Sequence, residues 1–210
     1  MKIKYLLALG LLLCFAQSML AQGGFEQYCY VTQQGIMTLV PIVHYQSFTN
    51  WYVEARYNYE GVGTYSLYAG KIFSKQGRFS YSITPLLGAV TGKFKGGSAG
   101  LNVTMDIGNV FFATQSQFTS STVGERSSFF FSWSELAYQP SKWCYAGLAL
   151  QHTRFLQTRT KSVEPGVVVG FSVGLWTIPF YVFSPMGNDR YYVVGMNLRL
   201  GSRIVETHLK

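Results

Sequence analysis

The sequence predicts an all-β protein, an antiparallel up-and-down barrel whose strands span a membrane. The first observation is alternation: from Leu101 to Ile107 the odd positions are apolar and the even positions are polar, and many other segments repeat the pattern. Period-two alternation indicates strands with one apolar and one polar face. The second is that the connections alternate in length along the chain. The third is that aromatic residues gather near segment ends.

The N-terminus is typical of a secretory signal. Lys2 and Lys4 precede an apolar stretch at 5–15, which is too short to span a bilayer, because a spanning helix needs about 20 apolar residues. Cleavage after Ala16 or Ala21 fits the pattern, and Ala21 is preferred on position. We therefore expect export and three parts, namely a signal peptide at 1–21, a barrel at 22–200 and a periplasmic tail at 201–210.

Turn signals divide the mature chain into about twelve strands, and ten is the alternative if the stretch before Thr49 is a periplasmic lead-in. The most apolar stretch, Val167 to Tyr181, is interrupted by glycine and proline, so it is not a transmembrane helix. The predicted strands span residues 25–33, 36–46, 50–60, 64–73, 79–91, 97–106, 109–118, 127–138, 142–155, 164–175, 177–184 and 190–200.

The connections form two sets. One set is short, at 47–49, 74–78, 108, 139–141 and 176. The alternate set begins with two tight turns and then becomes longer and more charged, at 92–96, 119–126, 156–163 and 185–189. Membrane barrels have short periplasmic turns and longer extracellular loops. The longer set is therefore predicted to be extracellular, and an even number of strands then leaves both termini in the periplasm.

The outward face is predicted to be the apolar one. Long apolar residues such as Val169 and Val194 share one face of their segments, and small or polar residues such as Gly170 share the other. Replacing Gly170 by serine should then be far milder than replacing Val169 or Val194 by arginine. The same alternation also fits a soluble barrel that binds an apolar ligand in its lumen. Candidate interfacial aromatic residues, which are typical of membrane barrels, favour the membrane; they are Trp51, Tyr59, Phe79, Trp133, Trp143, Tyr191 and Tyr192.

With these features the mature chain resembles the small outer-membrane β-barrel proteins of Gram-negative bacteria. The resemblance rests on pattern over nearly the whole mature chain. It implies a non-enzymatic barrel in the outer membrane, either structural or a narrow porin-like passive pore, in contact with outer-membrane lipid and with the barrel assembly machinery. One departure is that the chain ends in Lys210 and not in an aromatic residue, so a segment around Leu198–Leu200 would have to serve as the assembly signal.

The charge distribution suggests a second partner. The chain carries a formal net charge of +8, and basic residues sit in pairs at segment ends, for example Lys93 with Lys95 and Arg159 with Lys161. This arrangement is typical of contact with lipid or lipopolysaccharide phosphates at a membrane surface and not of a nucleic-acid face. Solvated loops are the alternative interpretation.

The lumen is predicted to contain a charged network. Charges inside a barrel must be paired or hydrated, so the network would either plug the lumen or form the charged constriction of a pore. Its predicted members are Glu54, Arg56, Asn58, Glu60, Asp106, Asn197 and Arg199.

An enzyme is the alternative from another class. Some barrel lipases and deacylases carry Ser and His on the lipid-facing surface, and Ser127 and His152 fall at the same end of neighbouring segments, with Glu125 as a candidate for orienting the histidine. The His-x-Ser arrangement is missing, because residue 154 is Arg.

The sequence predicts neither a cofactor nor a metal site. The three histidines are far apart and no phosphate-binding glycine loop is present. Cys29 and Cys144 remain after signal cleavage, and we expect them to be unpaired.

Overall fold

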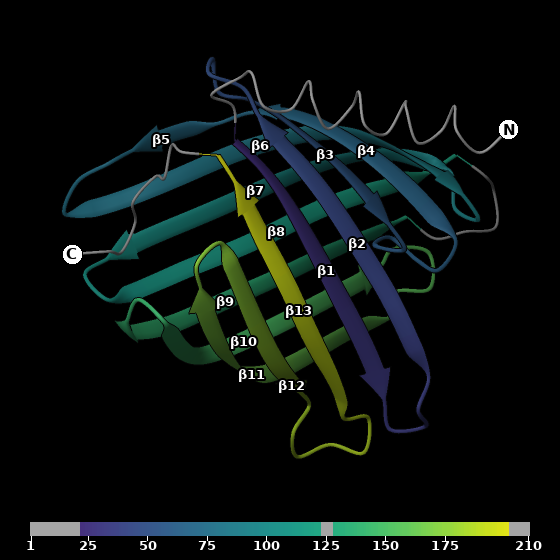
Figure 1. The fold of residues 1–210 in the computed structure, drawn as a ribbon. Coiled ribbons are helices and arrows are strands. Elements are labelled where there is room, and N and C mark those ends of the chain that lie inside the picture. The colour runs from purple at the N-terminus through teal and green to yellow at the C-terminus, as the bar shows by residue number, and fades with distance from the viewer. Residues whose placement is uncertain (1–21, 123–127, 202–210) are drawn as a thin grey trace, which may run out of the picture.

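The computed structural model describes residues 22–122 and 128–201, so the predicted signal peptide and most of the predicted tail lie outside the described residues. Thirteen strands form one antiparallel sheet (Figure 1). Among the described residues there is no helix long and apolar enough to cross a membrane. In chain order the strands are β1 (Gln22–Thr32), β2 (Met37–Gln46), β3 (Trp51–Tyr57), β4 (Thr64–Lys71), β5 (Phe73–Lys75), β6 (Phe79–Gly92), β7 (Gly96–Ile107), β8 (Val110–Ser121), β9 (Phe129–Ser141), β10 (Cys144–Phe155), β11 (Lys161–Val173), β12 (Trp176–Phe183) and β13 (Tyr191–Leu200).

The sheet closes into a barrel. β1 pairs with β13, and β4 pairs with β6. β5 is a short continuation of β4 beyond Ile72, and both pair with the same neighbour, β6. Thirteen strands less this one continuation give a wall of twelve, as predicted. The ten-strand alternative is wrong, because β1 and β2 are both hydrogen-bonded parts of the wall.

The inward and outward faces follow the predicted alternation in most strands. In β11 the odd residues such as Val167 and Val169 are exposed and the even residues Val168 and Gly170 are buried. β13 behaves in the same way, with Val194 outward. In β9 the odd residues, among them Trp133, face the lumen, whereas the proposed pairing of Ser127 with His152 required them to face outward.

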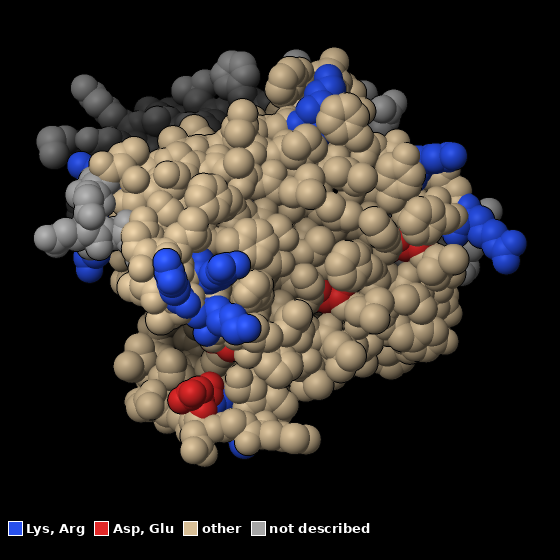
Figure 2. All heavy atoms as spheres, turned by 180° about the vertical axis from the view of Figure 1, so that it is seen from behind, with Lys and Arg blue, Asp and Glu red and all other residues tan. Residues whose placement is uncertain are grey.

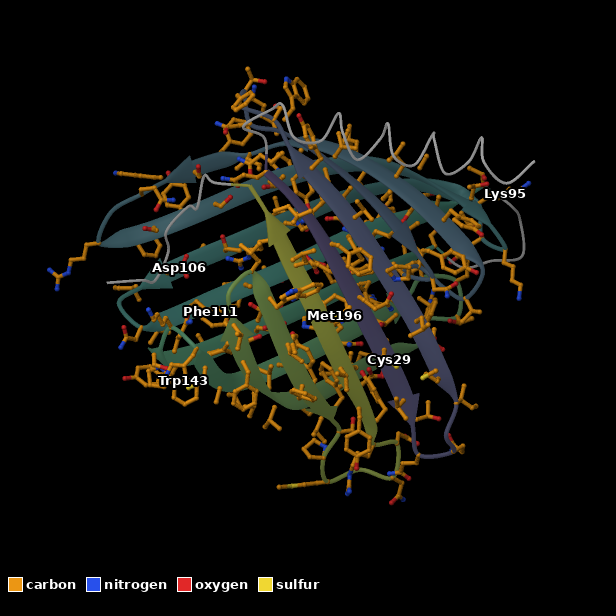
Figure 3. All side chains as sticks on the ribbon, in the orientation of Figure 1. Cys29, Lys95, Asp106, Phe111, Trp143 and Met196 are labelled. Atoms are coloured by element: carbon orange, nitrogen blue, oxygen red, sulfur yellow. The ribbon has the colours of Figure 1, made fainter. Side chains whose placement is uncertain are left out.

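The two ends of the barrel differ in their connections, as predicted. At the end that holds both termini the connections are short, for example 108–109, 142–143 and 174–175. At the opposite end they are mostly longer, with 58–63, 122–128 and 184–190 the longest. The tight turn predicted at 61–63 is wrong, because β3 ends at Tyr57 and the connection to β4 begins at residue 58. The predicted long connection at 92–96 shrinks to 93–95, because β6 and β7 extend their pairing to Gly96. In Figure 3, Lys95 lies at the long-loop end, while Asp106 and Trp143 lie at the short-turn end.

The outer face is the apolar one. Leu67, Leu87, Leu148 and Val173 are 58%, 73%, 62% and 76% exposed. The view in Figure 2 shows Lys and Arg at the ends of the barrel, with little charge on the band between them. A continuous apolar belt of this kind marks a surface that is buried against another apolar phase. The soluble alternative required the opposite arrangement, with polar residues outside and an apolar lumen.

Three of the predicted interfacial aromatic residues lie in the lumen instead. Trp133, Tyr191 and Tyr59 pack against other inward aromatic rings. The reason is strand parity: sequence position places a residue near a strand end, but only the pairing decides which face it occupies. The exposed Trp51, Phe79, Trp143 and Tyr192 remain on the outer surface.

Gly170 has little room for a side chain. An added Cβ at Gly170 would lie 2.1 Å from the ring of Tyr145. Gly170 stands directly opposite Tyr145 in the β10–β11 register, so its missing side chain leaves the space that this inward ring occupies.

Both cysteines are free. Cys29 lies near the long-loop end of β1, and Cys144 begins β10 at the short-turn end.

Candidate functional site

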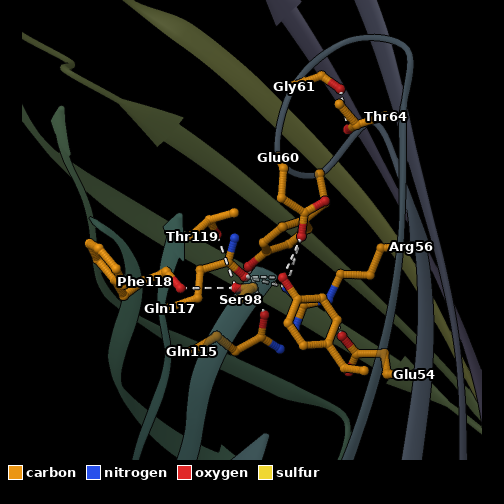
Figure 4. A network of polar contacts seen from close by, with 12 residues as sticks. Glu54, Arg56, Glu60, Gly61, Thr64, Ser98, Gln115, Gln117, Phe118 and Thr119 are labelled. Carbon is orange, nitrogen blue, oxygen red and sulfur yellow. Dashed lines mark hydrogen bonds and ion pairs between the residues drawn. The ribbon is translucent and has the colours of Figure 1, made fainter. Parts of the chain in front are cut away.

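Arg56 is the centre of a buried polar network in the lumen (Figure 4). Its guanidinium pairs with Glu54 on the same inward face of β3, and both residues are almost fully buried. Arg56 Nη1 donates to Gln117 Oε1 on β8 at 2.7 Å. Because β3 and β8 are not neighbours in the sheet, this hydrogen bond crosses the lumen.

The β3–β4 connection folds into the lumen and completes this network. The carboxylate of Glu60 lies 3.9 Å from Arg56 Nη1 and accepts a hydrogen bond from Tyr68 Oη at 2.8 Å. The rings of Tyr59 and Tyr68 lie 4.1 and 4.4 Å from the guanidinium carbon, within cation–π distance. Arg56 is thus enclosed by two carboxylates and two aromatic faces.

Tyr59 connects this loop to the far wall. Its hydroxyl donates to Gln115 Oε1 at 3.0 Å, and its ring packs edge-on against Phe131 at 5.6 Å. Burial raises the pKa of Tyr59 well above its ordinary value, so the hydroxyl stays protonated and remains a donor. The loop is therefore held across the lumen by contacts with β8 and β9.

A second polar chain runs along the wall toward the end with the termini. The hydroxyl of Tyr52 donates to Glu54, and its ring stacks on His44. His44 Nδ1 lies 3.6 Å from Glu26 Oε1, and Tyr28 Oη donates to Glu26 at 2.9 Å. A continuous series of side-chain contacts, polar except for the stacked rings of Tyr52 and His44, thus extends from Arg56 to β1.

Only three of the seven predicted network residues contact one another. Glu54, Arg56 and Glu60 are in contact, as described. Asn58 lies in the turn, where its side chain donates to the backbone of Leu39 and accepts from Gly63 N. The other three lie near the short-turn end of the barrel, away from Arg56: Asp106 on β7, and Asn197 and Arg199 on β13.

Sequence reasoning missed Gln115, Gln117, Tyr68 and Glu135. The two glutamines share the inward face of β8 with Thr119. Their spacing of two was a usable signal, but the other face of β8 carries Thr114 and Ser116, so polarity did not show which face was inward.

The remaining part of the lumen is aromatic. Trp133 on β9 lies 5.0 Å from Tyr181, 5.4 Å from Phe183 and 5.6 Å from Tyr28, measured between ring centroids. The contact with Tyr28 crosses the lumen, since β9 and β1 are separated by four strands in the sheet order. Glu135 accepts hydrogen bonds from Trp133 Nε1 at 2.9 Å and Tyr181 Oη at 2.7 Å. This cluster narrows the lumen independently of Arg56.

Carboxylates outnumber cations on the inward face of the described residues. On the strands the inward cations are Arg56 and Arg199, and His44 is the only inward imidazole of the described strands. The inward carboxylates are Glu26, Glu54, Glu60, Asp106, Glu135 and Glu164. The lumen is therefore acidic, although the chain as a whole is basic.

The candidate catalytic pair is not supported by strand parity. Ser127 lies outside the described residues. His152 faces outward, with its ring 5.8 Å from that of Phe130, whereas the odd-numbered residues of β9, whose parity Ser127 shares, face the lumen.

The hydroxyl opposite His152 in the register is Ser132, which belongs to an outward cluster. Ser116 donates to Ser132 at 3.0 Å, and Thr114 and Ser134 are 2.9 Å apart. These hydroxyls satisfy one another on an otherwise apolar face.

Among the described residues no group of His, Cys, Asp and Glu side chains has the arrangement of a metal site.

Comparison with known proteins identifies the fold. No protein-family model and no curated protein sequence matches the chain. The solved structure of the KdgM porin is similar, with a TM-score of 0.62 and 11% identity over 83% of this chain and 98% of that chain. The KdgM porin in complex with disordered oligogalacturonate gives a TM-score of 0.60 and 10% identity over the same shares. The fold is that of small outer-membrane porins.

Proposed function

We propose that this protein is a non-enzymatic, passive barrel of the outer membrane, whose narrow acidic lumen admits only small solutes and prefers cations. The proposal rests chiefly on one observation: side chains from opposite walls meet inside the barrel at two places, Arg56 with Gln117 and Tyr28 with Trp133. A twelve-stranded wall alone leaves room inside, so these contacts set the width.

The charge preference follows from the inward carboxylates. Charged residues at a constriction select solutes by sign, and the described inward face is mostly acidic. The KdgM porin has been solved with oligogalacturonate, a polyanion. This chain shares that fold but lacks a basic lumen among its described residues, so an anionic oligosaccharide is not the solute we propose.

A purely structural barrel is the second candidate, and the buried Glu54–Arg56 pair favours it, because buried partners hold a wall rigid without passing solute. The two candidates differ in conductance. In planar bilayers with a KCl gradient, we expect small channels with a reversal potential that indicates cation preference. Glu60→Gln together with Asp106→Asn should reduce that preference.

Anion preference would overturn the proposed selectivity. If the protein is shown to be folded but gives no conductance, the pore is ruled out and the purely structural role is favoured. Folding is checked by heat-modifiable migration on a gel, and Lys93→Gln with Lys95→Gln, at exposed loop positions, is the control for a general change in charge.

Orientation is tested separately. With both termini in the periplasm, the 184–190 connection lies outside the cell, and Met186 is fully exposed. We expect a cysteine at Met186 to react with an impermeant maleimide on intact cells, in a background without Cys29 and Cys144. A cysteine at Lys142 should react only after permeabilisation, and the reverse pattern would show that the topology is inverted.

A further inference from the structure

The outer face of the β10–β11 hairpin carries an ordered column of residues, cationic at the loop end and apolar below. The register pairs Arg154 with Lys161 and then His152 with Val163. Leu150 pairs next with Pro165, and Leu148 with Val167. Buried Ala149, Gln151 and Val168 have the opposite parity, so the whole column faces outward. Its chemistry changes from charged to apolar within about 13 Å along the strand, at roughly 3.3 Å per residue.

The two cations at the head of the column have no acidic partner among the described residues. Both are exposed, and like charges directly opposite each other destabilise a strand pair. The carboxylate of Glu164, on the same hairpin, faces inward and accepts hydrogen bonds from Tyr191 Oη at 2.6 Å and Ser162 Oγ at 2.7 Å. Arg159 in the connection adds a third exposed cation. An external anion is therefore the natural counter-charge.

An apolar groove lies directly below these cations. Two hollows of about 280 and 460 Å³ adjoin each other and share Leu148, Pro165 and Gly166. The first continues across the outer face to Phe112 and Leu136, and the second is bounded by the β12–β13 connection at Ser184–Gly187.

The local backbone explains this groove. Ser184 N donates to Pro165 O at 2.7 Å, and Gly187 N donates to Ser184 O at 2.9 Å. The first bond holds the connection against β11 at the edge of the hollow, and the second closes a turn within the connection. Pro165 stands opposite Leu150 on the neighbouring strand, and its small side chain leaves the floor low beside the larger leucines of β10. The result is a long apolar furrow, suited to a flexible hydrocarbon chain.

We propose that this face binds one molecule of phosphorylated, multi-acylated lipid of the lipopolysaccharide type. Its phosphate is held by Arg154 and Lys161, and one acyl chain lies in the groove at Leu148 and Pro165. Arginine and lysine are the usual partners of phosphate, and the groove lies at the depth where the acyl chains begin. The proposal rests on the outer-membrane orientation proposed above, because the column lies at the end opposite the termini and so faces the outer leaflet.

The test uses the full mature protein, folded in detergent and titrated with diphosphorylated lipid A, with the bound stoichiometry read by native mass spectrometry. We expect one retained lipid per barrel. Arg154→Gln with Lys161→Gln should weaken binding at least tenfold, and dephosphorylated lipid A should bind as weakly to the unaltered protein. The control is Lys75→Gln with Lys142→Gln, which removes two exposed cations at the short-turn end, away from the column, and should leave binding unchanged.

The groove is tested by filling it. Leu148→Trp should weaken binding several-fold, whereas Leu87→Trp, at an exposed outward leucine on β6, should not. Equal loss in the control variants would overturn the site. Equally strong binding of phosphatidylglycerol would overturn the assignment to a lipopolysaccharide-type lipid.

Conductance of the Arg154→Gln, Lys161→Gln protein should match that of the unaltered protein. The two proposals can therefore be tested separately. Loss of the lipid site would not contradict the pore, and absence of conductance would not contradict the lipid site.

Discussion

The two halves of the lumen are filled by different physical means. Around Arg56, on the β3, β4 and β8 side, buried charges are paired and hydrogen-bonded. Around Trp133, on the β1 and β9–β13 side, aromatic rings pack on one another, and their polar atoms donate to carboxylates such as Glu135. The aromatic half is stabilised by its packing, whereas the charged half depends on every partner being present. Stability and conductance should therefore respond differently in the two halves.

The largest effect is expected in the aromatic half. Trp133→Ala removes a ring that contacts both walls, and a buried Trp→Ala change costs about 3–5 kcal/mol. The free energy of unfolding, measured by urea titration in lipid vesicles, should fall by this amount, and single-channel conductance should rise. Trp143→Ala is the control, because Trp143 is 58% exposed at the β9–β10 turn, and it should change neither quantity greatly. Unchanged conductance in Trp133→Ala would mean that this cluster does not set the width.

The charged half should respond next. Arg56→Ala leaves Glu54 and Glu60 without their cation, and breaking a buried ion pair costs about 3 kcal/mol or more if the site is dry. Adding Glu54→Gln should recover part of the loss in the urea midpoint. Arg199→Ala, at an exposed residue of the short-turn end, should be nearly neutral. If Arg56→Ala alters ion selectivity while stability holds, the network is hydrated and belongs to a wet pore.

The outer face of the barrel can be compared with the two halves of the lumen. Val169→Arg places a cation on the lipid-facing surface, at a cost of about 2 kcal/mol or more near mid-bilayer. The yield of heat-modifiable, folded protein should fall. Val173→Arg, beside the short turn at 174–175, lies nearer the interface and should be milder, because the cost depends on depth. Equal tolerance of both would contradict a bilayer around this face.

The smallest expected effect tests the tight contact within the aromatic half. Gly170→Ser places a side chain where the ring of Tyr145 lies, and overpacking costs about 1–3 kcal/mol. Gly97→Ser, where an added Cβ meets nothing within 4 Å, should be close to neutral. Both are measured as shifts in the urea midpoint, and similar shifts would show that Tyr145 moves aside freely.

The sequence by itself determined the all-β class and the inward face of β3, and it predicted about twelve strands. These features can be predicted because alternation of period two and turn residues are local signals, which depend only on residues close together in the sequence. Glu54 and Arg56 were found together because they are two residues apart on one strand, so no knowledge of pairing was needed.

Only the tertiary structure decided what meets across the lumen. Gln117 reaches Arg56 and Trp133 reaches Tyr28 because the closure of β1 on β13 brings distant strands to face each other, and alternation does not encode which strands those are. The inward parity of β9 was likewise set by its register with β8 and β10, since both of its faces carry aromatic residues. The apolar groove on the outer face also depends on the tertiary structure, because the register brings together its lining residues from β8, β9, β10, β11 and the β12–β13 connection.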